Sequence, residues 1–320
     1  MRGHPNKLAL AFLAAACLGG AASGQEAPVP AGEEGVVLDY LEDRAERMTV
    51  PVSIDGRGPY RFVVDTGAER TVIARELASD LSLGRGRRTR VHSMSDVSVI
   101  ETAVIPDLEV GGRSVRGIQA PLLSRSHLGA EGMLGVDSLK SQRVSFNFAK
   151  QEMTVAPSRK REEPWAEGTI VVTGRSRYGH LVLVDAAVQG QKVWVIVDTG
   201  SEVTVGNSAL RRKLEQKGKL GALHPIDVIS VTGGRIVAER GAMRRIRIGG
   251  MDISDLPIAF ADVHPFRKLG LTDRPAILLG MDALQLFERV SVDFANRKVR
   301  MLARPHSRRK SGTMLAEAGF

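Results

Sequence analysis

Short runs of apolar and β-branched residues, separated by turns, dominate the hydrophobic pattern of the chain. The expected strands span 61–64, 97–105, 114–123, 144–148 and 153–156 in the first half, and 193–197, 226–231, 236–240, 246–248, 258–260 and 290–294 in the second. Runs of this kind, bounded by glycine-containing turns, are typical of strands. Helical patterns are confined to 74–81, 137–141, 207–218 and 282–287, with Asp137 and Asp282 as expected N-caps. The pattern predicts an all-β fold with short helices.

The expected elements carry the same motifs twice, in the same order. VVDTGAERTV at 63–72 matches IVDTGSEVTV at 196–205, and MLGVDSL at 133–139 matches LLGMDAL at 278–284. QRVSFNF at 142–148 likewise matches ERVSVDF at 288–294. This constant order indicates a tandem duplication of a unit of about 110 to 135 residues, the size of a small domain.

The duplication divides the chain into six segments. They are a signal peptide (1–24), a flexible lead-in rich in Pro, Gly and Glu (25–45), an N-terminal lobe (46–156), a charged linker (157–168), a C-terminal lobe (169–303) and a basic tail (304–320). Proline near each end of the linker and the charge of the tail favour exposed, irregular structure there.

The N-terminal segment has the layout of a secretory signal peptide. Arg2 and Lys7 precede an apolar run at 8–18, which is too short to span a bilayer, and small residues stand before Gln25. We therefore expect cleavage near residue 24 and a periplasmic or secreted protein. Two alternatives stay open: an uncleaved membrane anchor, and a lipoprotein in which Cys17 becomes the acylated first residue.

Composition narrows the expected chemistry. Aromatic residues make up only 4% of the chain and glycines number 34, as expected for short strands joined by tight turns. The net charge is +9, but the basic clusters at 85–90 and 304–310 lack interleaved aromatics; this favours a solvated or envelope-facing surface over nucleic-acid binding. The seven histidines are scattered and the single cysteine lies in the leader, so no disulfide, metal or cofactor is expected.

Asp65 and Asp198 each follow an apolar strand, where an unpaired buried carboxylate would be costly. A turn aspartate followed by a turn glycine would explain either copy alone. It does not explain why each copy is paired with a later glycine after two large apolar residues, at Gly135 and Gly280. The two motifs together resemble the retropepsin-like aspartic proteases, over about 250 of the 320 residues.

The resemblance implies two tandem β-barrel lobes related by a pseudo-twofold axis, each supplying one catalytic aspartate. Asp65 and Asp198 would share a proton, activate a water between them and hydrolyse peptide bonds of a polypeptide substrate. The Ser201 hydroxyl would donate to Asp198, whereas Ala68 offers Asp65 no such donor. We therefore expect Asp198 to be the ionised partner and Asp65 the protonated one.

The resemblance also implies roles for the surrounding residues. The supporting loop residues are Thr66, Gly67, Ala68, Thr199, Gly200 and Ser201, with the two threonines locking the loops by crossed hydrogen bonds and the two glycines allowing their close approach. The expected substrate contacts are Glu69, Glu202, Thr232, Gly233 and Gly234. The last three form the tip of a covering hairpin at 231–237, and a second hairpin is expected at 91–100.

Two questions stay open at this level. The scaffold is also compatible with a non-catalytic peptide- or envelope-binding protein, although both aspartates are present. Because both half-sites lie on one chain, a monomer is the expected functional form; pairing of lobes between two molecules is the alternative.

Overall fold

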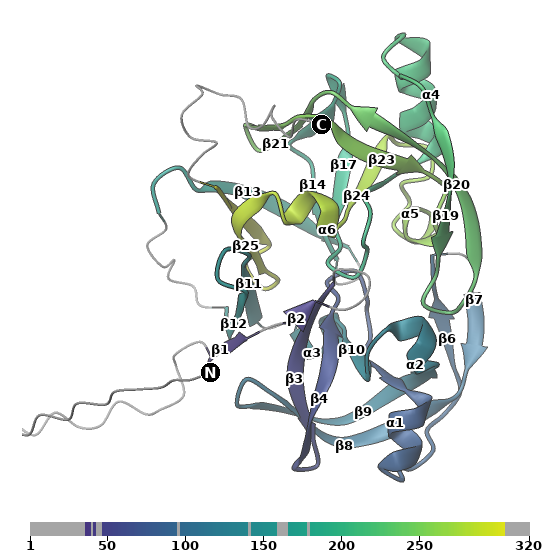
Figure 1. Cartoon of the computed structure of the whole chain (residues 1–320), viewed down its shortest axis with the longest axis vertical. Helices are drawn as coiled ribbons and strands as arrows, with labels where there is room; N and C mark the ends of the chain where they lie inside the picture. Colours follow the sequence, from purple (N-terminus) through teal and green to yellow (C-terminus); the bar gives the residue numbers. More distant parts are fainter. Residues whose placement is uncertain are drawn as a thin grey trace, which may run out of the picture. The chain divides into compact units, whose positions relative to one another are not determined.

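The computed structural model describes residues 36–39, 41–42, 47–94, 97–139, 142–158, 166–177 and 180–304. The predicted signal peptide and all but the first residue of the predicted basic tail lie outside these ranges. Strands dominate the described part and the helices are short, as the hydrophobic pattern predicts (Figure 1).

The first lobe is a seven-stranded sheet that curls on itself. Its strand order is β2 (Leu41–Glu42), β3 (Met48–Ile54), β4 (Arg57–Val64), β10 (Gly132–Leu134), β5 (Val72–Ala74), β9 (Arg113–Leu123) and β8 (Thr102–Val110), and β3 also pairs with β8. Met48, Val50, Val52 and Ile54 are buried at alternate positions of β3, because successive side chains of a strand point to opposite faces. This lobe also contains α1 (Arg75–Asp80), α2 (Arg125–Leu128) and α3 (Val136–Leu139).

The second lobe repeats this topology. Its strands follow the order β14 (His180–Leu183), β17 (Trp194–Val197), β24 (Ala276–Leu279), β18 (Val205–Gly206), β23 (Leu256–Phe260), β20 (Arg235–Met243) and β19 (His224–Ile229). β15 (Ala186–Val188), β16 (Gln191–Lys192), β21 (Ile246–Ile248) and β22 (Met251–Ile253) form a separate sheet, and the helices are α4 (Ser208–Gln216), α5 (His264–Lys268) and α6 (Met281–Leu284). The parallel pair of β4 with β10 recurs as β17 with β24, so the duplication in sequence is a duplication in structure.

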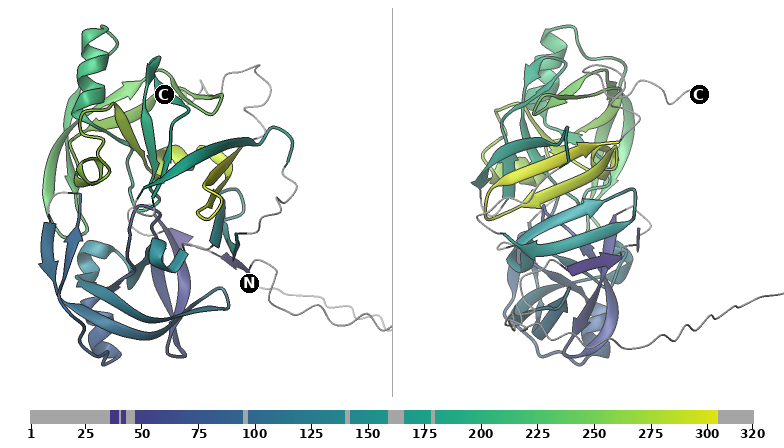
Figure 2. Two further views of the ribbon diagram at one scale, coloured as in Figure 1. Left: turned by 180° about the vertical axis from the view of Figure 1, so that it is seen from behind. Right: turned by 90° about the vertical axis from the view of Figure 1, so that its left-hand side faces the viewer.

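The lobes are joined by a shared sheet. Its order is β1 (Val36–Asp39), β12 (Glu152–Pro157), β11 (Gln142–Asn147), β25 (Phe287–Asp293), β26 (Lys298–Ala303) and β13 (Ile170–Arg177), and these strands run side by side in the right view of Figure 2. At its centre β11 pairs antiparallel with its own repeat, β25, and the hydroxyls of Ser145 and Ser291 lie 2.8 Å apart. Antiparallel pairing of equivalent strands places an approximate twofold axis between the two serines.

The predicted lead-in needs correction, because its last part belongs to the fold. Val36–Asp39 forms β1, which pairs with β12, and Leu41–Glu42 forms β2, which pairs with β3. β1 occupies the position in the first lobe that β13 occupies in the second. The Pro, Gly and Glu content that predicted irregular structure lies mostly before residue 36, and the backbone groups at the free edge of β12 provide a hydrogen-bonding partner for the segment that follows.

Candidate active site

The two DTG loops meet at the boundary between the lobes. Asp65 follows β4 and Asp198 follows β17, and both side chains are buried, with 9% and 6% of their surface exposed. A Cβ atom added to Gly67 would lie closer than 3.0 Å to the Asp198 carboxyl, and one added to Gly200 would lie equally close to the Asp65 carboxyl. Each glycine therefore leaves the space that the opposite aspartate fills, as the motif predicts.

Crossed hydrogen bonds between the threonines lock the loops together. The Thr66 N–H donates to Thr199 Oγ1 at 3.0 Å, and the Thr199 N–H donates to Thr66 Oγ1 at 3.1 Å. Each hydroxyl then donates across the boundary, Thr66 Oγ1 to the carbonyl of Val197 at 3.0 Å and Thr199 Oγ1 to that of Val64 at 2.7 Å. The expected lock is present, and it ties the end of each buried strand to the opposite loop.

The later glycines, Gly135 and Gly280, pack against the DTG loops and donate hydrogen bonds to them. The Gly135 N–H donates to Thr71 Oγ1 and the Gly280 N–H donates to Thr204 Oγ1, both at 3.2 Å. A Cβ atom at Gly135 would meet the backbone of Arg70 within 3.0 Å, so only glycine fits against the loop. The second motif therefore packs directly on the catalytic loop, which explains why the two motifs recur together.

Asp137 and Asp282 are not the N-caps that the pattern predicts. They lie inside α3 and α6, and the N-cap of α6 is Gly280. The Asp137 carboxylate accepts from both the N–H and the hydroxyl of Thr71 at 2.8 Å, and the Asp282 carboxylate accepts from the same groups of Thr204 at 3.0 and 2.6 Å. Both acids therefore bind the DTG loops, and Asp137 also accepts from the Ser138 N–H of its own helix at 2.9 Å.

Burial raises the pKa of both DTG carboxyls, Asp65 and Asp198. For Asp65 the burial is opposed by a hydrogen bond from Asp198 and by the N–H groups of Gly67 and Ala68, which donate to Oδ1 at 2.7 and 2.9 Å. For Asp198 the negative charge of Asp65 adds to the burial and holds its pKa well above the ordinary value. The positive charge of Arg47 also favours the ionised form of Asp65.

The hydroxyl of Ser201 does not make the bond that was expected of it. Its hydroxyl donates to the backbone carbonyl of Val203 at 2.8 Å. The expected hydroxyl bond to Asp198 is therefore replaced by a bond inside the loop.

Above the aspartates lies a cavity of about 620 Å³ that both lobes line. Two hairpins cover it: β6 (Thr89–His92) with β7 (Val97–Ile100), and β19 with β20 (Figure 1). The carbonyl of Met94 accepts a hydrogen bond from the His264 N–H of the opposite lobe at 3.0 Å. Gly233 lies so close to the ring of His127 that an added Cβ atom would clash with it, so each hairpin tip reaches the other lobe.

The expected substrate contacts divide into two groups. Glu69 and Glu202 both line the cavity. Thr232, Gly233 and Gly234 form the hairpin turn, where the Gly233 N–H donates to the Ser230 carbonyl at 2.8 Å, but they do not line the cavity. Ser230 and Val231 form that part of its wall instead, because the turn itself points toward the other lobe.

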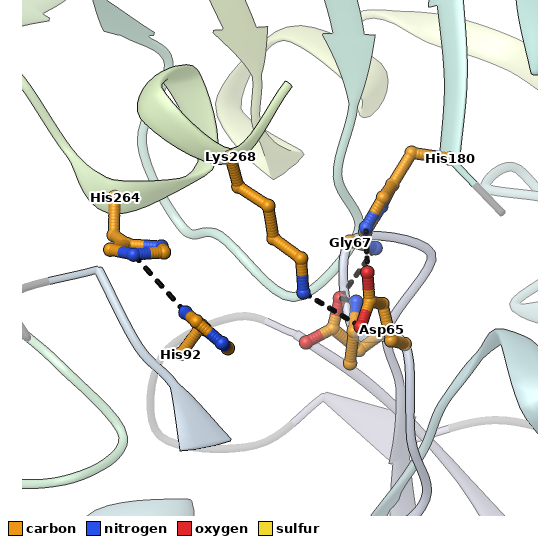
Figure 3. A network of polar contacts seen from close by, with 8 residues as sticks. Asp65, Gly67, His92, His180, His264 and Lys268 are labelled. Carbon is orange, nitrogen blue, oxygen red and sulfur yellow. Dashed lines mark hydrogen bonds and ion pairs between the residues drawn. The ribbon is translucent and has the colours of Figure 1, made fainter. Parts of the chain in front are cut away.

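Several residues of the site were not predicted from the sequence. Glu69 contacts two basic side chains of the second lobe, Lys268 Nζ at 2.7 Å and His180 Nε2 at 3.7 Å. Figure 3 shows Lys268 and His180 reaching this place from different elements. The hydrogen bond from His180 and the charge of Lys268 lower the pKa of Glu69 to about 2. His180 stands at the same distance before its DTG motif as Arg47 does before the first one, so the repeat could have indicated it. No sequence pattern pointed to Lys268, which lies on the short helix α5.

A pair of histidines adjoins this group. His92 Nδ1 and His264 Nε2 are 3.1 Å apart, joining the β6–β7 hairpin to α5. Within the described ranges, no group of three His, Cys, Asp or Glu side chains is arranged to hold a metal ion. Nor is any described helix both long and apolar enough to cross a membrane.

The family comparison agrees with this geometry. The family model for aspartyl protease matches residues 50–138 and 184–283, one match in each lobe, and each match includes one DTG loop and its later glycine. The comparison with curated proteins gives no match. With more than half of its length matched by the family model and both aspartates meeting between the lobes, the chain belongs to the aspartyl protease family, in a two-lobed retropepsin-like form.

Proposed function

We propose that the protein is an aspartic endopeptidase that hydrolyses peptide bonds of polypeptides with a water activated between Asp65 and Asp198. The observation that carries the proposal is the pairing of two buried carboxyls, held by crossed threonine hydrogen bonds at the floor of a cavity. Two carboxyls in contact and out of water share one proton, which is the state that this chemistry requires.

The mechanism follows from the raised pKa values. Asp65, ionised, accepts a proton from the bound water as the water oxygen attacks the carbonyl carbon. Asp198, protonated, donates a hydrogen bond to the carbonyl oxygen, on which negative charge develops. The proton taken by Asp65 then passes to the departing amine as the C–N bond breaks, so no acyl-enzyme forms.

Cleavage of a peptide library by the purified protein tests the proposal, with the Asp65→Asn variant as the blank. Cleavage by the native protein alone, at internal bonds, supports an endopeptidase. Binding of peptides without any cleavage would instead favour a non-catalytic peptide- or envelope-binding protein. Equal cleavage by both proteins would show that a contaminant or another site is responsible.

We further propose that one chain is the functional unit. Both half-sites lie on the same chain and meet through the shared sheet, which supports this reading. Activity per molecule should stay constant on dilution into the low-nanomolar range, whereas a site shared between chains would lose activity as the chains dissociate.

For the location, we propose a periplasmic or secreted protein on the strength of the leader sequence. Intact-mass measurement of protein from a Gram-negative host tests this. A chain beginning near Gln25 agrees with the proposal, and a diacylglyceryl adduct on Cys17 would establish a lipoprotein attached to the cell envelope.

A further inference from the structure

Six residues at one end of the cavity form a group that we call the basic cluster. Its members are Glu69, Arg90, His92, His180, His264 and Lys268, all of which line the cavity. They come from a DTG loop, β6, β14 and α5, and thus from both lobes; in Figure 3 Lys268 and His180 reach toward the loop that carries Asp65, and His92 and His264 face each other beside it. Only one of the six is an acid.

The single acid of the cluster is already neutralised. Glu69 has Lys268 Nζ at 2.7 Å and His180 Nε2 at 3.7 Å, on different carboxylate oxygens. Its pKa of about 2 keeps it ionised, so its negative charge balances Lys268. The remaining charge of the cluster is therefore positive, and a substrate group finds no unpaired carboxylate here.

Arg90 supplies the uncompensated charge. Its side chain is exposed and lines the cavity, and it has no ion pair or side-chain hydrogen bond with any residue that the structure describes. Burial lowers the pKa of the neighbouring His92, and the charges of Lys268 and Arg90 lower it further, while the charge of Glu69 raises it. His92 is in turn 3.1 Å from His264.

The two covering hairpins differ in charge at one equivalent position. In each covering hairpin a buried serine, Ser93 or Ser230, directly follows the first strand. These two serines are equivalent positions and allow the two hairpins to be compared residue by residue. Three positions earlier, Arg90 in the first hairpin corresponds to Asp227 in the second, and Asp227 is paired with Arg235. At this equivalent position the first hairpin carries a cation without an ion pair among the described residues, and the second carries an acid that is already paired.

We propose that the basic cluster binds a carboxylate group of the polypeptide substrate, with Arg90 as its principal ligand. An Asp or Glu side chain and a C-terminal carboxylate both supply this chemistry, and a guanidinium matches either with two parallel hydrogen bonds. A neutral group at this place would leave Arg90 unpaired in a partly enclosed cavity. The inference rests on the proposed function for the identity of the substrate, but binding can be measured without hydrolysis.

The test uses short synthetic peptides in which a single Glu replaces Gln at each position in turn, each made as a free acid and as a C-terminal amide. Binding to the Asp65→Asn protein is measured by isothermal titration calorimetry. We expect a carboxylate at one position, or at the C-terminus, to tighten binding by about tenfold, the effect of a charge-assisted hydrogen bond. A Glu preference in the amides identifies a side chain, and a free-acid preference in the all-Gln peptides identifies the C-terminus.

Variants of Arg90 assign the effect to the cluster. Arg90→Gln should reduce the preference to less than twofold and Arg90→Lys should retain most of it. Arg88→Gln is the matched control, because Arg88 is an exposed arginine two positions away that does not line the cavity. The preference should also weaken as salt is added, since Arg90 is exposed.

Three outcomes would overturn the inference. The Glu and Gln peptides, and the acids and amides, could all bind equally; no acidic peptide could bind at all; or the preference could survive Arg90→Gln. The proposed function fails separately. A native protein that cleaves peptides without any carboxylate preference keeps the function and loses the inference. A protein that binds acidic peptides through Arg90 but cleaves none keeps the inference and loses the function.

Discussion

The two lobes share the framework behind the aspartates, while the residues that face the cavity differ. The bonds from Gly135 to Thr71 and from Gly280 to Thr204 have the same length, 3.2 Å, and the crossed threonine bonds are nearly equal. Facing the cavity, the equivalent positions hold Arg47 and His180, Arg70 and Val203, and Arg90 and Asp227. The repeat keeps its buried polar network and varies the side chains that substrate would contact.

Burial explains this division except at Arg47 and His180, which differ although both are buried. Thr66, Thr71, Thr199 and Thr204 are at most 1% exposed, so loss of any one of them would leave buried polar groups without partners. Arg70 and Arg90 are exposed, and a different residue at either place leaves no buried group unsatisfied. The same substitution at equivalent buried positions of the two lobes should therefore have equal effects. At equivalent positions that face the cavity, the effects should differ between the lobes.

The largest effect is expected at the aspartates, where both halves are equally required. Asp65→Asn and Asp198→Asn should each lower kcat by a factor of about 10³ or more, because either change removes the proton-sharing pair. Steady-state assays on a library-derived peptide measure this. Appreciable activity in one variant alone would show that the halves are not equivalent and would contradict the two-aspartate mechanism.

The same variants have a stability control. Because burial raises the pKa of both carboxyls, their contribution to stability is present below the unfolded-state value near 3.9 and is lost as pH rises through the folded-state values. The native protein should therefore lose more thermal stability between pH 4 and pH 7 than either Asn variant, as followed by circular dichroism.

The next largest effect concerns the threonine lock. Thr66→Val and Thr199→Val should each lower the free energy of unfolding by about 2 to 4 kcal/mol, since each leaves a buried N–H and a buried carbonyl without a partner. Urea denaturation of the two variants measures the loss. Costs that differ by more than about 1 kcal/mol would break the equivalence of the two loops.

A smaller effect is expected at Glu69, where the halves differ. Lys268→Gln should lower the free energy of unfolding by about 1 kcal/mol at pH 6, a value reduced for solvent screening because the Glu69 side chain is 35% exposed. The lowered pKa of Glu69 means that this contribution is present above its ordinary value of 4.5 and is lost as pH falls towards about 2.

Urea denaturation at pH 6 and at pH 3 checks the Lys268 prediction, with the exposed Lys213 replaced by Gln as a control. A cost for Lys268→Gln that is as large at pH 3 as at pH 6 would show that the lysine acts by packing and not through the charge of Glu69.

The smallest effect concerns which aspartate carries the charge. Arg47→Gln should move the acidic limb of the pH–activity profile upward by about half a unit, because Arg47 favours the ionised form of Asp65. Ser201→Ala should leave this limb in place, because its hydroxyl bonds to Val203. A shift in Ser201→Ala with none in Arg47→Gln would restore Asp198 as the ionised partner.

The sequence by itself determined the duplication, the all-β fold and the two DTG loops. These features depend on contiguous motifs, in which an apolar strand, an Asp-Thr-Gly turn and a later glycine follow one another at short range. The hydrogen bonds between Thr66 and Thr199 could also be predicted, because the family resemblance of the two motifs implies how the two loops face one another.

Only the tertiary structure decided the features that join distant positions. Residues 36–39 of the lead-in form β1 because they pair with the free edge of β12. The Ser201 hydroxyl donates to the carbonyl of Val203 and not to Asp198. His92 and His264 are 172 positions apart, and Lys268 reaches Glu69 from the other lobe. No local sequence pattern predicts such contacts, because they depend on how two complete lobes pack. These contacts determine the charge of the cavity around Asp65 and Asp198, the two residues that the motifs had already indicated.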